Sequence, residues 1–288
     1  MKFGILPPYR AGVTTDARWM TAFVRHAEAL GFESVYVVEH VVVVSGYAER
    51  YPYASSGRMP LPDDCEIPDP LELLAYLAAV TERIVLATGI LVMPHHHPLV
   101  LAKRLATLDV LSGGRVRLGV GVGWMEEELQ ATGVDFASRG RRTDEIIDAM
   151  RVTWREDEST YVGQFFEFSR VRSYPKPVQV GGVPIHIGGH SEVAARRAGR
   201  LGDGFQPLGL DPDGLEQRMR TLRATAEEYG RDPDVIELSL GGHVTQVDRA
   251  AVEQARSLGA QRMVISTGSA DLDTLRGEMD EFARRVIG

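Results

Sequence analysis

The chain has 288 residues, of which 44% are hydrophobic and 25% are charged, as is usual for a folded globular protein. Its net charge of −8, with no basic tract to offset it, argues against nucleic acid or an anionic membrane as a partner. Cys65 is the single cysteine, which excludes an internal disulfide, and the N-terminus lacks the apolar core of a secretion signal. These features predict a protein of the cytoplasm.

The N-terminal part of the chain alternates apolar runs with helical patterns. Strands are predicted at 2–6 and 34–38, and an amphipathic helix lies between them, from about Asp16 to Gly31. Residues 41–68 show no clean period and contain three tyrosines, which predicts an ordered lid over a binding site. Asp69 and the proline after it then begin a second helix.

The stretch from Ile84 to Trp124 predicts a strand, a helix and a second, parallel strand. The strands cover 84–92 and 115–122, and the helix begins at Pro98. In the second strand, glycines alternate with apolar residues and leave one face bare. Such a face lets a flat ligand approach closely, but tight packing within a barrel explains it equally well.

The remaining chain continues the alternation, with an insertion at 157–183 that can form a hairpin. Further strands are predicted at 185–187, 203–206, 236–240 and 262–266, and helices at 142–155, 191–200, 211–229, 250–258 and 272–286. Eight strands alternating with helices predict one (β/α)8 TIM barrel over residues 1–288, an α/β fold with insertions after strands two and four. An open doubly wound sheet is the alternative, but no G-x-G-x-x-G motif follows the first strand.

Ligands of such barrels bind at the C-terminal ends of the strands, which selects the candidate site residues. These are Glu39, His40, Gly89, Ile90, Gly121, Trp124, Gly188, Gly189, His190 and Ser191. His40 can donate a proton or bind a cofactor carbonyl, or it can be structural, and Glu39 can hold the tautomer of His40 or simply pack. The free N–H groups of the helix after Gly189 can bind a phosphate, although such turns are common without a ligand.

Two clusters of side chains suggest chemistry less strongly. Adjacent residues rarely point at one ion, and no further ligand lies at a suitable spacing from His95, His96 and His97, so no metal site is predicted. His95 and His96 could instead border a substrate pocket. The arginines of residues 139–142 are followed at once by acidic residues and are interpreted as a solvated helix start.

Four blocks in matching order resemble the bacterial luciferase-like monooxygenase superfamily, and within it the oxidoreductases that depend on coenzyme F420, a deazaflavin. The blocks are Glu39-His40, HPLVLAKRLATLDVLSGGRVRLGVGVGW, RGRRTDEIIDAMRVTW and PIHIGGHSEVAARRAGRLGDGFQP. The last 80 or so residues show only a compatible pattern. The resemblance implies F420 as the cofactor, with FMN as the alternative, a small organic substrate and a homodimer.

The resemblance also implies roles for particular residues. The block Gly188–Ser191 would hold the phosphate of the cofactor side chain, and His40 would lie beside the reactive ring. Gly89-Ile90 aligns with the site of a non-prolyl cis peptide behind the ring. Glu128 matches a common family carboxylate, although it could merely cap a helix. Trp124 stands where members that oxidise sugar phosphates carry a carboxylate, which weakens the case for such a substrate.

The same resemblance implies that His97 is an N-cap-like structural residue. Three functions therefore remain open. The leading one is hydride transfer between F420 and a small organic molecule. The second is an FMN-dependent monooxygenase supplied by a separate reductase, and the third is a non-catalytic barrel that binds a flavin.

Overall fold

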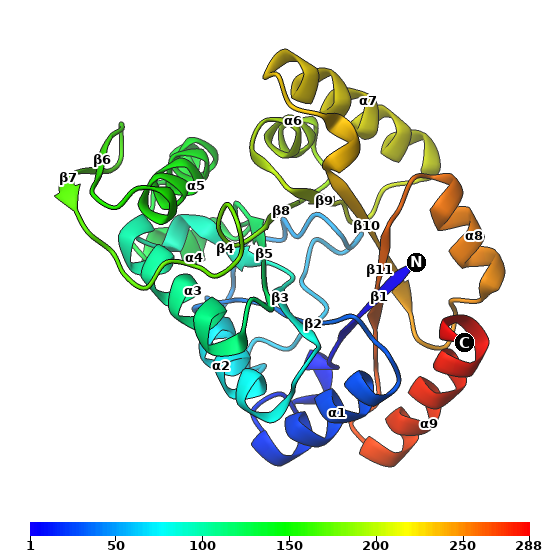
Figure 1. The fold of residues 1–288 in the computed structure, drawn as a ribbon. Helices are drawn as coiled ribbons and strands as arrows, with labels where there is room; N and C mark the ends of the chain where they lie inside the picture. Colours follow the sequence, from blue (N-terminus) through cyan, green and yellow to red (C-terminus); the bar gives the residue numbers. More distant parts are fainter.

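Eight parallel strands close into a barrel in the computed structural model, which describes residues 1–288 (Figure 1). The strands are β1 (Lys2–Leu6), β2 (Ser34–Val37), β3 (Val85–Thr88) with its continuation β4 (Leu91–Val92), β5 (Val116–Gly121), β8 (Ile185–Gly188), β9 (Gly204–Gln206), β10 (Glu237–His243) and β11 (Arg262–Ser266). Because β1 pairs with β11 and β3 pairs with β5, the sheet has no free edge. The predicted (β/α)8 fold is confirmed.

Helices surround this barrel. They are α1 (Ala17–Ala29), α2 (Pro70–Val80), α3 (Pro98–Ser112), α4 (Glu126–Ala131), α5 (Arg139–Arg155), α6 (Glu192–Leu201), α7 (Pro212–Glu228), α8 (Arg249–Ser257) and α9 (Leu272–Phe282). Five of them begin after an aspartate whose carboxylate accepts hydrogen bonds from the first-turn amides, namely Asp16, Asp69, Asp211, Asp248 and Asp271. None of the helices is long and apolar enough to cross a membrane.

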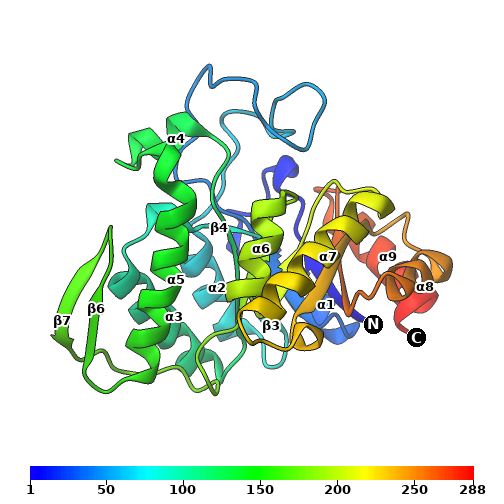
Figure 2. The ribbon, with the colours of Figure 1, turned by 90° about the horizontal axis from the view of Figure 1, so that it is seen from above.

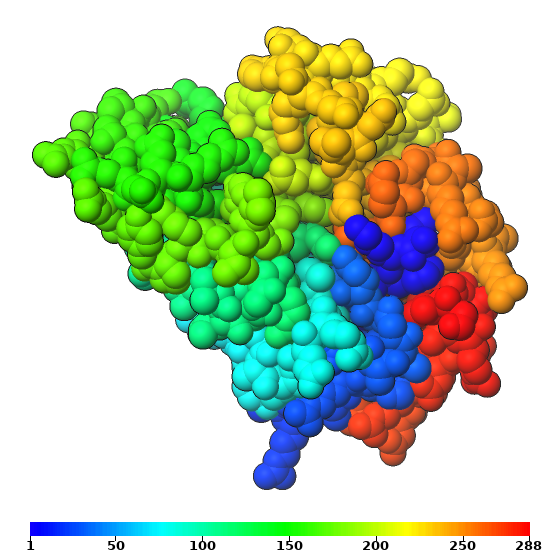
Figure 3. Space-filling model, viewed as in Figure 1, coloured from blue at the N-terminus to red at the C-terminus, as the bar shows by residue number.

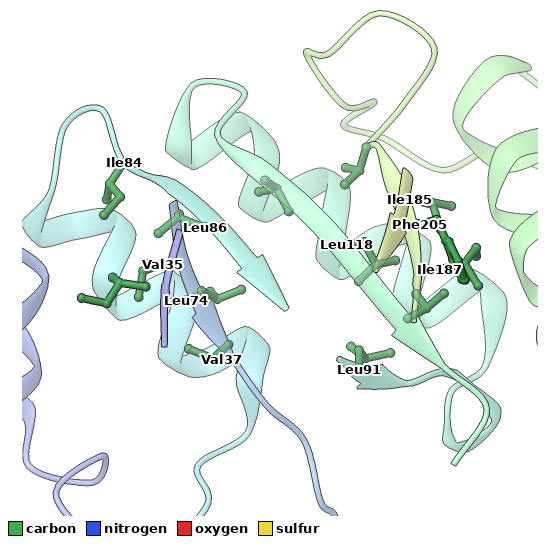
Figure 4. Packing of buried hydrophobic residues seen from close by; sticks show 14 of the residues in the cluster. Val35, Val37, Leu74, Ile84, Leu86, Leu91, Leu118, Ile185, Ile187 and Phe205 are labelled. Carbon is green, nitrogen blue, oxygen red and sulfur yellow. The ribbon is translucent and has the colours of Figure 1, made fainter. Parts of the chain in front are cut away.

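The core lies between the strands and the helices as one cluster of 53 buried residues. Figure 4 shows part of it, in which Val35 and Val37 of β2 lie close to Leu74 of α2, while Leu118 of β5 is paired with Ile185 of β8. The strands are apolar almost throughout because parallel strands in a barrel are covered on both faces.

The third strand differs from its prediction. The expected strand over 84–92 is interrupted between β3 and β4, where the Gly89–Ile90 peptide bond is cis, as the family resemblance implied. The Ile90 side chain then occupies space that two glycines leave free. A Cβ atom at Gly121 would lie 2.7 Å from Ile90 Cδ1, and one at Gly188 would lie 2.8 Å from Ile90 Cγ2.

The glycines of β5 therefore serve packing within the barrel. A Cβ atom at Gly119 would lie 2.1 Å from the carbonyl oxygen of Thr88, and one at Gly123 would lie 3.0 Å from the Val92 side chain. The spacing of these glycines predicted a bare face on the strand. In the structure, residues of the interrupted third strand cover that face.

The two insertions lie in different places. The segment between β2 and α2 arches over the C-terminal end of the barrel, on the side where α4 lies, as Figure 2 shows. The second insertion forms an antiparallel hairpin of β6 (Ser159–Val162) and β7 (Glu167–Val171), which stands beside α5 and forms a lobe in Figure 3. The two chain termini lie close together (Figures 1 and 2).

Charged side chains fill the opposite, N-terminal end of the barrel. Arg262 is fully buried and hydrogen-bonds Glu33 at 3.0 Å and Glu237 at 2.9 Å. Burial raises the pKa of Glu33, but hydrogen bonds and charge from Arg117 and Arg262 outweigh it and hold that pKa at about 2. Burial, reinforced by the same two arginines, lowers the pKa of His186 to about 3. This end of the barrel is built for stability.

Candidate active site

A cavity of about 1750 Å³ opens at the C-terminal ends of the strands. Every residue that the strand-end rule selects lines it, and so does Glu128. The barrel closure brings these strand ends together, as the general rule for such folds predicts.

His40 and Glu128 form a hydrogen-bonded pair in the cavity wall. His40 Nδ1 lies 2.8 Å from Glu128 Oε2, and the two side chains are only 10% and 2% exposed. Because a carboxylate only accepts, Nδ1 carries the hydrogen, which leaves the lone pair of the neutral ring on Nε2. The second carboxylate oxygen accepts the Val41 N–H at 2.7 Å. Glu128 therefore orients His40 and is not a helix cap.

Glu39 does not hold His40, so that interpretation is wrong. Its carboxylate accepts the Val92 N–H at 2.5 Å and lies 2.9 Å from His96 Nε2. Side chains of consecutive residues in an extended segment point to opposite sides, which explains why Glu39 and His40 have different partners. Glu39 instead fixes the third strand beside the second, the packing role left open above.

The three consecutive histidines lie behind the cavity wall. His95 Nδ1 is 2.7 Å from Thr132 Oγ1, and its Nε2 is 3.7 Å from Glu128 Oε1. Neither His95 nor His96 lines the cavity, so the expectation that they border the substrate pocket is wrong. His97 occupies the N-cap position of α3 without a side-chain capping bond, and its ring packs on Phe166. Each of the three histidines therefore contacts a different partner, and the three rings do not converge on one point.

Trp124 is the centre of an aromatic cluster at the mouth of the barrel. Its ring meets those of Tyr47, Tyr51 and His40 edge to face, with centroids 5.3, 5.1 and 6.0 Å away. The lid predicted over residues 41–68 therefore packs directly on the end of β5.

The N-terminus of α6 presents unpaired donors to the same cavity. The amides of His190 and Ser191 make no hydrogen bond within the chain, while Ser191 Oγ accepts the Ala194 N–H at 3.1 Å. Gly189 has φ +113°, a conformation that side chains rarely tolerate. The buried atoms His190 Nδ1 and Gln206 Oε1 also have no partner. This donor-rich, uncovered end fits a phosphate-bearing cofactor.

The sequence reasoning missed two features of this region. Gln206 ends β9, so the strand-end rule could have selected it. Arg139 and Arg142 are half-buried and donate to the Phe136 and Pro94 carbonyls at 2.7 and 3.0 Å. The interpretation of these two as solvated is therefore wrong, because their guanidinium groups stack on aromatic rings.

Comparison with known proteins agrees with this geometry. Residues 1–285 match the luciferase-like monooxygenase family. The chain belongs to this family. Among its relatives, an uncharacterized protein of Mycobacterium tuberculosis (strain H37Rv) is 33% identical over 86% of this chain and 83% of its own. An F420-dependent glucose-6-phosphate dehydrogenase of Amycolatopsis mediterranei is 28% identical over 94% and 80%.

Luciferase-like proteins of both cofactor types are similar to this one. An FMNH2-dependent dimethylsulfone monooxygenase of Pseudomonas putida is 31% identical over 64% of this chain and 50% of its own. Monooxygenase RslO1 of Streptomyces bottropensis has the same fold, with TM-score 0.79 and 22% identity over 100% and 99% of the two chains. An F420-dependent secondary alcohol dehydrogenase superposes with TM-score 0.77 and 19% identity over 99% and 98%. The chain is thus a member of a family of oxidoreductases and monooxygenases that use F420 or FMN.

Proposed function

We propose that this protein is an oxidoreductase that exchanges hydride between coenzyme F420 and a small organic substrate in the barrel cavity. When bound, the deazaflavin supplies a hydride donor or acceptor. The observation that carries the proposal is that one cavity holds both an oriented histidine, His40, and the unpaired amides at the start of α6.

His40 would act as the acid–base group. With a hydride acceptor bound, oxidation of an alcohol to a carbonyl would release the hydroxyl proton, and His40 Nε2 would accept it. Glu128 then lies against the new imidazolium and stabilises its charge. In the opposite direction His40 returns the proton to the carbonyl oxygen.

The α6 end would anchor the cofactor. The amides of His190 and Ser191 and the positive end of the α6 dipole favour a phosphate, and the absence of a side chain at Gly189 leaves the approach open. Ile90, held between Gly121 and Gly188, would press on one face of the ring. The relative from Amycolatopsis, similar over nearly the whole chain, supports F420 over FMN.

Fluorescence titration of the purified protein tests the cofactor assignment. We expect F420 to bind with a dissociation constant in the micromolar range or below, and FMN to bind more weakly. Tighter binding of FMN would instead favour the two-component monooxygenase, which the relative from Pseudomonas putida supports. Should F420 bind while the wild-type protein turns over no substrate, the non-catalytic flavin-binding barrel would be favoured.

We also propose that the protein is a cytoplasmic homodimer without nucleic-acid or membrane partners. The exposed apolar side chains Val100 and Leu111 on α3, 58% and 75% exposed, offer a surface for a second copy. Light scattering at micromolar concentration measures the mass directly, and a monomer would contradict this part of the proposal.

A further inference from the structure

The cavity is larger than most ligand sites. Ligand sites commonly enclose about 300–1000 Å³, whereas this cavity encloses about 1750 Å³. The α6 end suits the cofactor proposed above, which leaves the region beneath the lid. We call the part of the cavity around His40 that is lined by Tyr51, Met59, Leu61 and Trp124 the lid compartment.

The walls of the lid compartment are apolar and firmly held. Met59 is buried together with Tyr47, and its N–H donates to the Tyr47 hydroxyl at 3.1 Å. Tyr51 and Leu61 pack against the same cluster, and so does Trp124, whose ring is nearly perpendicular to that of His40. A molecule in this compartment would touch aromatic and aliphatic surface on most sides.

The charged side chains bordering the lid compartment already have partners. The half-buried Arg139 donates to the Phe136 and Gly123 carbonyls at 2.7 and 3.3 Å and stacks on the Phe136 ring. Glu128 is paired with His40, and the Arg50 guanidinium lies 2.6 Å from a carboxylate oxygen of Glu126. Arg58 is paired with an acidic residue of the lid, at 3.3 Å, and stacks on an aromatic ring. Arg10 also lines the cavity, but it is exposed and would hold a ligand charge in contact with water. A phosphate or carboxylate under the lid would thus lose its hydration without gaining a buried counterion that is free of other partners.

Two polar groups remain to orient a substrate. Burial raises the pKa of the Tyr51 hydroxyl, which keeps its proton and makes no hydrogen bond within the chain. His40 contributes the free Nε2 lone pair. Together these two groups can bind one hydroxyl group, since Nε2 accepts its hydrogen and the Tyr51 hydroxyl donates to its oxygen. A carbonyl oxygen accepts from the Tyr51 hydroxyl, and from Nε2 only when that nitrogen carries the proton that is returned to the carbonyl.

We propose that the lid compartment binds an uncharged organic molecule with an apolar or aromatic body, whose hydroxyl or carbonyl group lies between His40 and Tyr51. The proposal deepens the function proposed above and rests on it for the reaction. It predicts that phosphorylated and carboxylated molecules are poor substrates, because every buried cation at the compartment already has partners.

A matched pair of alcohols tests this proposal. The probes are 1-phenylethanol and 4-(1-hydroxyethyl)benzoate, which share the reacting carbon and differ by one carboxylate. Binding is measured by calorimetry, both to the protein loaded with F420 and to the protein alone. We expect the carboxylate to bind at least about a hundredfold more weakly than the neutral alcohol. Equal or tighter binding of the carboxylate, or no detectable binding of the neutral alcohol, would overturn the proposal.

Variants of Trp124 locate the bound alcohol. Trp124→Ala should weaken binding of 1-phenylethanol by about tenfold, whereas Trp124→Phe should retain most of it. Trp19→Phe is the matched control, since Trp19 lies on α1 and donates its indole N–H to Ala270 outside the cavity. An equal effect of Trp124→Ala and Trp19→Phe would contradict the location. If the protein does not bind F420 but still binds 1-phenylethanol more tightly than 4-(1-hydroxyethyl)benzoate, only the cofactor assignment is refuted.

Discussion

Replacing Glu128 by glutamine should change the hydrogen bond that orients His40 while leaving the other contacts of the site in place. The glutamine carbonyl can still accept the Val41 N–H, which Glu128 now accepts at 2.7 Å, so the loop after β2 should keep its place. The amide nitrogen would then face His40 Nδ1. Since that nitrogen only donates, Nδ1 must become the acceptor and the proton must move to Nε2. His40 could then no longer accept a proton from a substrate.

The size of the effect follows from the contact. A hydrogen bond to a charged group contributes about 1.5–3 kcal/mol, so losing the charge alone should slow hydride transfer about ten- to a hundredfold. If the tautomer changes fully, the loss should approach that of His40→Ala, about 10²- to 10⁴-fold. F420 affinity should change less than about twofold, because the α6 amides are untouched.

Two measurements check this prediction. Single-turnover reduction of F420 by 1-phenylethanol gives the rate, and nitrogen NMR of labelled histidine reports the His40 tautomer without any substrate. Glu127→Gln is the control, since its carbonyl keeps the Ala48 N–H bond that Glu127 accepts at 2.9 Å on the same helix. The reasoning fails if Glu128→Gln keeps both the wild-type tautomer and a rate within about threefold of wild type while His40→Ala is inactive.

Three further outcomes are expected. Ser191→Ala should weaken F420 binding about ten- to a hundredfold and, because Ser191 also caps α6, lower the unfolding free energy by about 1 kcal/mol; titration and thermal melts measure each part. Residues 41–68 should become more protected from hydrogen exchange when F420 and 1-phenylethanol bind, and unchanged protection would argue against a lid. The folded His186 has its pKa lowered to about 3, so only the unfolded chain takes up this proton between pH 6.5 and 3. Stability should therefore fall by up to about 4–5 kcal/mol as the pH falls through that window, and His186→Gln should flatten the fall seen in denaturant titrations.

Local patterns in the sequence were sufficient to predict the strand order and the ends of strands that form the site. Alternating apolar runs and helical stripes, with aspartates at helix starts, depend on neighbours in the chain and can be recognised there. His40 and the Gly188–Ser191 turn were found because the barrel rule needs only the position of each strand end.

Partners distant in the chain could not be predicted. Glu128 lies 88 residues after His40, and the spacing of the two in the sequence carries no sign of their hydrogen bond. The glycines of β5 were ambiguous for a related reason. Their period indicates that something approaches closely, but only the closed barrel shows that Ile90 and Thr88 do so.

The acidic residues at the start of α4 contact the segment after β2, which is distant from them in the sequence. The three consecutive glutamates each fix a different point of the segment after β2: Glu126 binds Arg50, Glu127 accepts the Ala48 N–H, and Glu128 holds His40 and the next amide. One helical turn thus fastens both the lid and the proposed acid–base group. Since the same short helix carries both contacts, a lid that moves away should release α4 and disorder His40 with it. Closure of the lid over a substrate and orientation of the histidine are then one event, and the site would become competent only when it is closed.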